Sequence, residues 1–404
     1  MYYTHIFRYT NCRKGGGNMK QTLDTIFENA LKRAGGIPGV VAMVTNKEGI
    51  IYEGAFGVRD IDSQQPMTLD SVFAMFSTTK ALVGAVAMKL MEDGKLHLDD
   101  PVENYVPEIA EIEVLEGFSD NGEPRTRKAQ VKPTVRMLLL HTAGFGYEFF
   151  NEEDRKYREA MNVPTILTSS FASIKSVLLF EPGTDWNYGA NIDWVGKVIE
   201  AVTAMRLSEA ITHYLFQPLG MTDIGFTLTD DMLMRRVSIH QRSPEGILQA
   251  QPNVVLPMPP AMDMGGHGLY ASIGEYMKFL RMMLNNGEGV LTKETVDLMA
   301  QNGLNELQSG GWTTADANLA NAGEFFPGVK KSWSYTFQVN DEAAPTGRPA
   351  HQLMWAGLAN LYYWIDRENE IAGFFATQIF PYHDPAAYMT YLEFESAVYA
   401  SLKK

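Results

Sequence analysis

The stretch FAMFSTTKALVGAVAMKLMEDG, residues 73–94, decides how the rest of the chain is interpreted. After Lys80, apolar residues recur at the three- and four-residue spacing of a buried helix face, and Gly94 supplies a stop signal. Three hydroxyl residues and a lysine nevertheless stand where this apolar helix begins. Because Ser77 and Lys80 are three residues apart, their side chains share one face of a helix and can meet.

Two interpretations of the Ser77–Lys80 pair follow. Backbone N–H groups near a helix start lack internal partners and can stabilise a developing negative charge, so Ser77 is a candidate nucleophile activated by a buried lysine. Alternatively, a hydroxyl caps the helix and Lys80 extends to water. Spacing alone does not decide, because Ser-x-x-Lys recurs at Ser401–Lys404, on the last residues of the chain. The apolar helix after Ser77 favours the first copy.

Composition excludes several classes of protein. The chain has 404 residues, long enough for two domains or for one domain with a large insertion. Its net charge of −14 argues against a nucleic-acid partner. Cys12 is the single cysteine, so neither an intrachain disulfide nor a cysteine-rich zinc site is expected, and no metal or cofactor is indicated. Without a long apolar run or a signal-peptide pattern, we expect no membrane partner and a cytoplasmic location.

The two ends of the chain carry mirrored patterns. An amphipathic helix over 19–36 precedes two β-rich runs around a turn at 46–49. A second hairpin pattern over 360–380 precedes a closing helix. One antiparallel sheet made from both ends and covered by both terminal helices is the economical assembly, which makes the predicted fold class α+β.

The predicted domain organisation follows from these patterns. Residues 1–18 are expected to be a disordered N-terminal extension. An α/β domain is expected from 19–98 and 300–404, and a mainly helical domain from 99–299, with the active site between them.

Two further features suit a catalytic partner for Ser77. Tyr188 stands in a loop just ahead of a helical pattern, where its hydroxyl can point into a cleft and share a proton with Ser77 and Lys80. A tyrosine packed at a helix start is the plainer alternative. Gly357, just before a late strand, would let the backbone come close to a substrate.

Together these motifs resemble the serine β-lactamase and penicillin-binding-protein superfamily. The resemblance rests on Ser77-Thr78-Thr79-Lys80, on the loop tyrosine and on Trp355-Ala356-Gly357 before the late strand. Within that superfamily, YGANIDWVGKVIEAVT is similar to family VIII carboxylesterases, and more so to the lovastatin side-chain acyltransferase type. The stretches 138–147 and 265–280 also fit.

The resemblance implies a β-lactamase/penicillin-binding-protein-like fold and assigns roles to residues. Ser77, Lys80 and Tyr188 would be catalytic, and the backbone N–H groups of Ser77 and Leu358 would form the oxyanion hole. The substrate-binding residues it implies are Trp355, Gly357, Phe145, Tyr147 and Asn191.

One departure from that superfamily bears on the substrate. The Lys-Thr-Gly triad, whose cation holds the carboxylate of a β-lactam, is replaced by Trp355-Ala356-Gly357. The sequence therefore predicts a serine carboxylesterase that hydrolyses short-chain acyl esters through a Ser77 acyl-enzyme. An acyltransferase, a weak β-lactamase or D-amino-acid peptidase, and a non-catalytic relative are the alternatives. Either Lys80 or Tyr188 can be the base.

Overall fold

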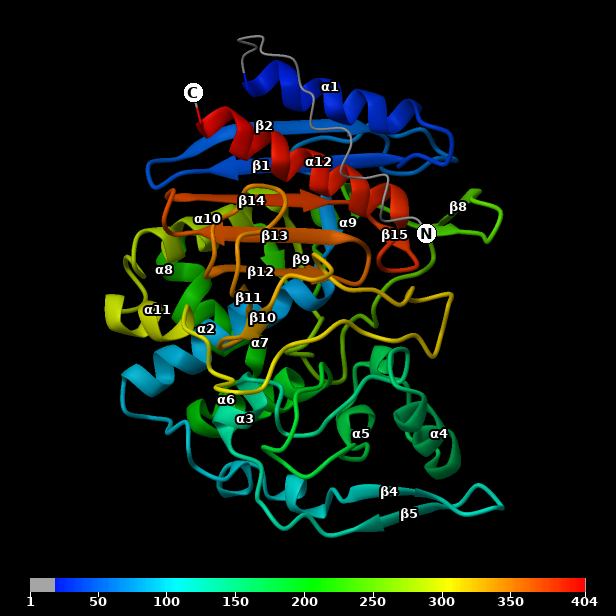
Figure 1. The fold of residues 1–404 in the computed structure, drawn as a ribbon, viewed down its shortest axis with the longest axis vertical. Coiled ribbons are helices and arrows are strands. Elements are labelled where there is room, and N and C mark those ends of the chain that lie inside the picture. The colour runs from blue at the N-terminus through cyan, green and yellow to red at the C-terminus, as the bar shows by residue number, and fades with distance from the viewer. Residues whose placement is uncertain (1–18, 404) are drawn as a thin grey trace.

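Both ends of the chain contribute to one seven-stranded antiparallel sheet, in the order β10-β11-β12-β13-β14-β1-β2 (Figure 1). The computed structural model describes residues 19–403, so the predictions about Cys12 and the extension 1–18 lie outside the described residues. The strands are β1 (Gly39–Thr45), β2 (Ile50–Gly57), β10 (Lys331–Trp333), β11 (Gln338–Asn340), β12 (Gln352–Gly357), β13 (Leu361–Asp366) and β14 (Ile371–Ala376). The predicted sheet is thus confirmed.

The hairpins form where turn chemistry predicts them. The Asn46 side chain accepts hydrogen bonds from the amides of Glu48 and Gly49, which closes the β1–β2 turn. Asp366 closes the β13–β14 turn in the same way, by accepting hydrogen bonds from the amides of the second and third residues after it. In each of these two hairpins, a side chain within the turn holds the turn closed.

Helices cover both faces of the sheet. On one face lie α1 (Met19–Lys32) and α12 (Pro385–Leu402), where the Phe27 ring is 6.3 Å from Phe375 of β14 and 5.4 Å from Phe394 of α12. On the other face lies α10 (Ile273–Leu284), with Tyr276 4.9 Å from Phe374. Although α10 falls within the range 99–299, it packs on the sheet.

The remaining helices and strands are mostly short, and Ser77 lies on a short 3-10 turn ahead of α2. The helices are α2 (Thr79–Glu92), α3 (Val135–Leu139), α4 (Glu152–Met161), α5 (Phe171–Ile174), α6 (Asn191–Thr203), α7 (Leu207–Ile211), α8 (Gln217–Leu219), α9 (Asp230–Met234) and α11 (Lys293–Met299). The strands are β3 (Val72–Ala74), β4 (Val114–Phe118), β5 (Pro124–Arg127), β6 (Ile224–Gly225), β7 (Ile239–Arg242), β8 (Leu248–Gln251), β9 (Tyr270–Ser272) and β15 (Ile379–Phe380).

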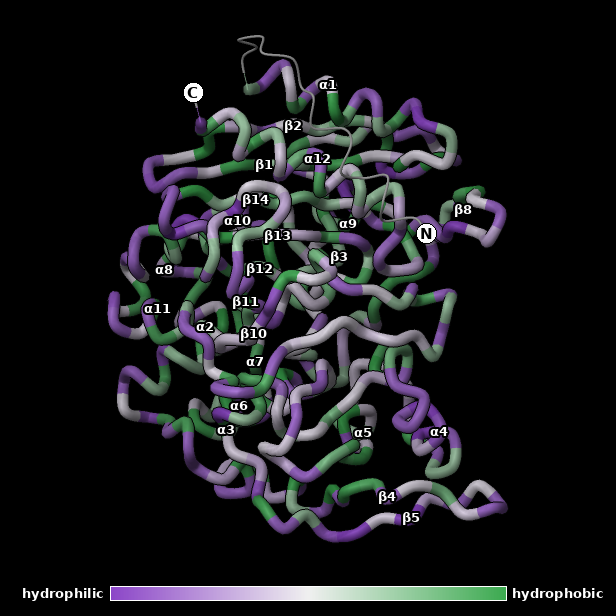
Figure 2. Tube along the Cα trace, viewed as in Figure 1, coloured by the Kyte–Doolittle hydropathy of each residue, from purple (hydrophilic) through white to green (hydrophobic). Residues whose placement is uncertain are grey.

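Hydropathy follows this arrangement. Apolar residues run along the central strands and inner helices, whereas α4 is largely hydrophilic (Figure 2). The β4–β5 hairpin lies at the end of the molecule away from the large sheet (Figure 1). None of the helices described within residues 19–403 is long and apolar enough to cross a bilayer.

Candidate active site

Ser77 lies on a short, constrained turn. Residues Phe76–Thr78 form one 3-10 turn directly before α2, and Phe76 has a φ of 44°, a left-handed conformation that costs energy for a bulky residue. The turn is held by the Tyr276 hydroxyl, which donates to the carbonyl of Thr78 at 2.8 Å. This hydrogen bond helps to hold Ser77 just before the N-terminal end of α2 rather than within the helix.

Gly357 allows the edge of the sheet to approach this turn. A Cβ atom built on Gly357 would lie 2.6 Å from the carbonyl oxygen of Met75, which no side chain tolerates. The sequence predicted that this glycine would let the backbone approach a substrate. The close approach in the structure is to Met75, two residues before Ser77, and it brings the end of β12 beside Ser77.

Lys80 is fully buried and donates hydrogen bonds to three neutral oxygens. Its Nζ lies 3.2 Å from Ser77 Oγ, 2.9 Å from the Tyr147 hydroxyl and 2.8 Å from the carbonyl oxygen of Gly266. Burial lowers the pKa of Lys80, and the negative charge of Asp193 partly opposes that change. The alternative in which Lys80 extends to water is wrong, because its side chain has no exposed surface.

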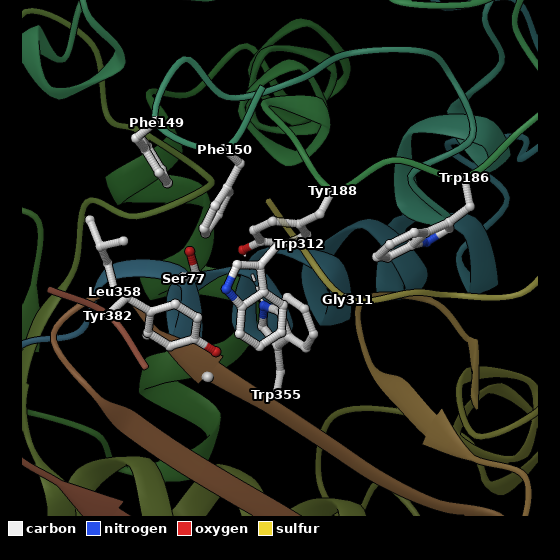
Figure 3. A pocket seen from close by; sticks show the side chains of 12 residues that line it. Ser77, Phe149, Phe150, Trp186, Tyr188, Gly311, Trp312, Trp355, Leu358 and Tyr382 are labelled. Carbon is white, nitrogen blue, oxygen red and sulfur yellow. Dashed lines mark hydrogen bonds between the residues drawn. The ribbon is translucent and has the colours of Figure 1, made fainter. Parts of the chain in front are cut away.

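Tyr188 comes from the loop before α6 and meets the same group. Its hydroxyl accepts a hydrogen bond from Trp355 Nε1 at 3.1 Å, and its ring centroid lies 4.7 Å from Lys80 Nζ. Burial raises the pKa of Tyr188, while hydrogen bonding with Ser77 and Trp355 opposes the rise. Ser77, Lys80 and Tyr188 therefore lie in one group, and Figure 3 shows the hydroxyls of Ser77 and Tyr188 side by side.

A cavity opens over Ser77, and its walls are aromatic. It is lined by Ser77, Phe149, Phe150, Trp186, Tyr188, Gly311, Trp312, Trp355, Ala356, Gly357, Leu358 and Tyr382 (Figure 3). The rings come from separate segments: the loop after α3, the loop before α6, the segment that leads to β10, strand β12 and the segment before α12. None of these lining residues carries a charged side chain.

Only some of the predicted substrate-binding residues line the cavity. Trp355 and Gly357 line the cavity, and so does Leu358, which was predicted as an oxyanion donor. Tyr147 is buried outside the lining and accepts a hydrogen bond from Lys80. The remaining two predicted residues need correction. Phe145 packs on Trp194, 5.8 Å between ring centroids, and the Asn191 side chain is bonded to His141 at 2.9 Å, so neither lines the cavity.

Sequence reasoning missed most of the aromatic wall. Phe149 and Phe150 face the cavity although Phe145 does not, and Trp312 and Tyr382 join them from the C-terminal third of the chain. The adjacent aromatic residues at 149–150 were a visible signal. Trp312 had no local pattern that could mark it.

Asp193 was also missed, and it is the buried acid of the site. It lies on α6 with no exposed surface, and its Oδ1 accepts a hydrogen bond from the Gly266 amide at 2.7 Å. Burial raises the pKa of Asp193, whereas Lys80 and the Gly266 amide oppose that rise. Among residues 19–403, no group of three His, Cys, Asp or Glu side chains is arranged to hold a metal ion.

Comparison with known proteins identifies the family. A family model described as beta-lactamase matches residues 23–398. The chain belongs to the β-lactamase family. Among its relatives in that family, the monacolin J acid methylbutanoyltransferase of Aspergillus terreus is 30% identical, with 95% of this chain and 96% of the relative covered. The lovastatin esterase of Penicillium rubens is 31% identical, over 88% and 92%.

A solved structure agrees with the fold. Unliganded simvastatin synthase from Aspergillus terreus matches with a TM-score of 0.84 at 28% identity, covering 96% of this chain and 100% of that one. The predicted resemblance and fold class are confirmed. The chain is accordingly a serine hydrolase or acyltransferase of the β-lactamase family.

Proposed function

We propose that this protein is a serine carboxylesterase that hydrolyses short-chain acyl esters through an acyl-enzyme on Ser77. Ser77 Oγ bonds to the ester carbonyl carbon, and its proton passes to the Lys80–Tyr188 pair. The bond to the leaving alcohol then breaks, and the pair returns that proton to the alcohol. Water next attacks the acyl carbon, loses a proton to the pair, and releases the carboxylic acid while Ser77 is reprotonated.

The proton-transfer pair acts as a unit. Lys80 donates to Ser77 Oγ, and the Tyr188 hydroxyl lies within the same group of side chains. Two interacting titratable groups share their protons, so the pair rather than either residue is the base. The backbone N–H groups of Ser77 and Leu358 are the proposed oxyanion donors.

The observation that carries the substrate class is the cavity wall, which is aromatic and has no charged side chain. An uncharged acyl group loses nothing by leaving water for such a site, whereas an unpaired carboxylate loses its hydration without replacement. For this uncharged site we propose acyl chains of roughly two to six carbons. The lovastatin esterase among the relatives supports ester chemistry.

A second candidate is acyl transfer from the same acyl-enzyme to an alcohol. Two observations favour it: one relative is named a methylbutanoyltransferase, and the aromatic wall provides few polar partners for an attacking water. The two candidates differ only in the second step, where an alcohol oxygen replaces the water oxygen and the product is a new ester.

The test is a chain-length series of p-nitrophenyl acyl esters, with and without an added alcohol. Release of p-nitrophenol together with free carboxylic acid supports the esterase. If most of the acyl group appears as a new ester at modest alcohol concentration, the acyltransferase replaces it. No release of p-nitrophenol above the rate in buffer for any chain length contradicts both.

A further inference from the structure

Asp193 lies in the interior, next to the catalytic group but outside the cavity wall. It is at the third position of α6, where the unpaired N–H groups of the helix start favour a negative charge. The same short segment carries Tyr188, five residues earlier. A fully buried carboxylate is costly unless it is bonded or faces a positive charge, so its presence here needs a reason.

Two short paths connect Asp193 to Lys80. In the first path, Asp193 Oδ1 accepts a hydrogen bond from the Gly266 amide at 2.7 Å. The carbonyl oxygen of the same glycine accepts a hydrogen bond from Lys80 at 2.8 Å. Through the second, Tyr147 accepts a hydrogen bond from Lys80 at 2.9 Å and lies beside the Asp193 carboxylate, where its hydroxyl lowers the carboxyl pKa. Both paths end on the lysine that contacts Ser77.

Gly266 makes this arrangement possible. A Cβ atom at that position would lie 2.5 Å from Asp193 Oδ2 and 2.9 Å from the Tyr147 hydroxyl. Only glycine lets the backbone pass between the carboxylate and the lysine. The close fit indicates that Gly266, Tyr147 and Asp193 form one support for the Lys80 side chain.

On the basis of the proposed function, we infer that Asp193, with Tyr147 and Gly266, is a positioning group that keeps Lys80 within hydrogen-bond distance of Ser77. This group also sets the pH range in which the Lys80–Tyr188 pair accepts a proton. Asp193 does not touch the cavity, so it acts through Lys80 and not on the substrate. Its negative charge balances the proton that the pair takes up when Ser77 attacks.

The sign of the effect is the same whichever partner is the base. Asp193 raises the pKa of Lys80 and also that of Tyr188, because a negative charge favours the protonated form of both. The other titratable groups facing Lys80 are Tyr147, His141 and His267. Burial lowers the pKa of both histidines, to about 3 for His267, so both are neutral near pH 7. Removing the Asp193 charge therefore lowers the pKa of the pair.

The experiment measures the rate of covalent labelling of Ser77 by a fluorophosphonate across a pH series, followed by intact-protein mass. This readout needs no knowledge of the natural ester. For Asp193→Asn, we expect the acidic limb of the rate profile to move to lower pH by about one unit, with a slower plateau. Tyr147→Phe removes an acceptor of the Lys80 ammonium and should move the limb in the same direction.

The matched control is Asp366→Asn, which alters another fully buried aspartate, in the β13–β14 turn. It should lower thermal stability and leave the acidic limb in place. If Asp193→Asn and Tyr147→Phe labelling profiles superimpose on that of the wild type, the inference is overturned. If Asp193→Asn does not fold, Tyr147→Phe alone decides by the same criterion. Labelling that is equal in wild type and Ser77→Ala instead overturns the proposed function.

Discussion

Two pairs of opposite charges in the interior are built differently. Arg348 and Glu395 are both fully buried and in direct contact, with Nε 3.0 Å from Oε1, and Thr346 donates a further hydrogen bond to Glu395. Lys80 and Asp193 are equally buried, yet the three hydrogen-bond acceptors of Lys80 are neutral oxygens, none of them a carboxylate. One pair is closed; the other is separated by a glycine and a tyrosine.

The difference explains why only one pair can do chemistry. A guanidinium does not lose its proton in a protein, so Arg348 and Glu395 are a fixed pair that ties the connection before β12 to α12. A lysine can lose its proton when burial lowers its pKa, and a distant carboxylate opposes that change only in part. Separation of the charges keeps Lys80 able to exchange a proton with Ser77.

The largest expected effect comes from removing Ser77, the proposed nucleophile that Lys80 contacts. Ser77→Ala should reduce kcat on p-nitrophenyl esters by on the order of 10³ to 10⁶, as for loss of a covalent nucleophile. Ser401→Ala is the matched control, because the hydroxyl of this second Ser-x-x-Lys serine is bonded to the carbonyl of Ala397 in α12. A Ser77→Ala enzyme that keeps more than a tenth of wild-type activity contradicts the assignment.

Next come the two members of the proton-transfer pair. Lys80→Ala and Tyr188→Phe should each reduce kcat by about 10²–10⁴, the usual contribution of acid–base catalysis. Their losses should not multiply, because groups that act as one unit are strongly non-additive. The measurement is a double-mutant cycle on kcat. A double variant whose loss equals the product of the single losses would show that the two residues act independently.

Breaking the Arg348–Glu395 pair should lower the stability of the fold and leave the catalytic reaction unchanged. Glu395→Gln leaves the Arg348 charge buried without its partner, which should lower the free energy of unfolding by roughly 3–5 kcal/mol. Replacing both residues, as Arg348→Met with Glu395→Leu, should restore most of the loss, since a well-packed apolar pair often replaces a buried ion pair. Denaturant unfolding measures the stabilities.

The pH profile of esterase activity is the second readout for these variants. Because Arg348 does not titrate and neither residue lines the cavity, the acidic limb should stay where it is in the wild type. A limb that moves in Glu395→Gln would mean that the two pairs are coupled, and the contrast drawn between them would be wrong.

The sequence predicted those parts of the molecule that depend on local chemistry. The hairpins followed from turn residues such as Asn46 and Asp366, whose side chains bond the backbone within the same turn. Ser77 and Lys80 were found because a polar pair at helical spacing interrupted an apolar helix. Local signals of this kind do not depend on the rest of the fold.

Features set by contacts between distant segments could not be predicted. Asp193 has the sequence context of an ordinary polar residue in the first turn of a helix, and only the approach of Gly266 makes it a buried partner of Lys80. Phe145 and Phe150 are phenylalanines five residues apart in one loop, but the loop turns Phe145 toward Trp194 and Phe150 into the cavity. The direction of a loop side chain is decided by tertiary packing.

The smallest expected effect is the preference for an uncharged ester over a β-lactam, whose carboxylate would have no positively charged partner in the cavity. A β-lactam brings a carboxylate, and the Lys-Thr-Gly cation that would meet it is replaced by Trp355, whose indole N–H is already donated to Tyr188. The cavity wall offers no charged side chain in its place. Burying an unpaired carboxylate is costly enough to remove most of the binding. We therefore expect kcat/KM for p-nitrophenyl butyrate to exceed that for benzylpenicillin by at least ~10²-fold, about 2.7 kcal/mol of transition-state free energy. Nitrocefin, which is more reactive, should be opened slowly by the same serine.

Trp355→Phe is the informative variant, because it keeps the apolar wall but removes the donor to Tyr188. It should lower ester turnover without improving benzylpenicillin. Equal kcat/KM values for benzylpenicillin and the ester in the wild type would show that the missing cation does not set the substrate class, and a β-lactamase would then be the better description.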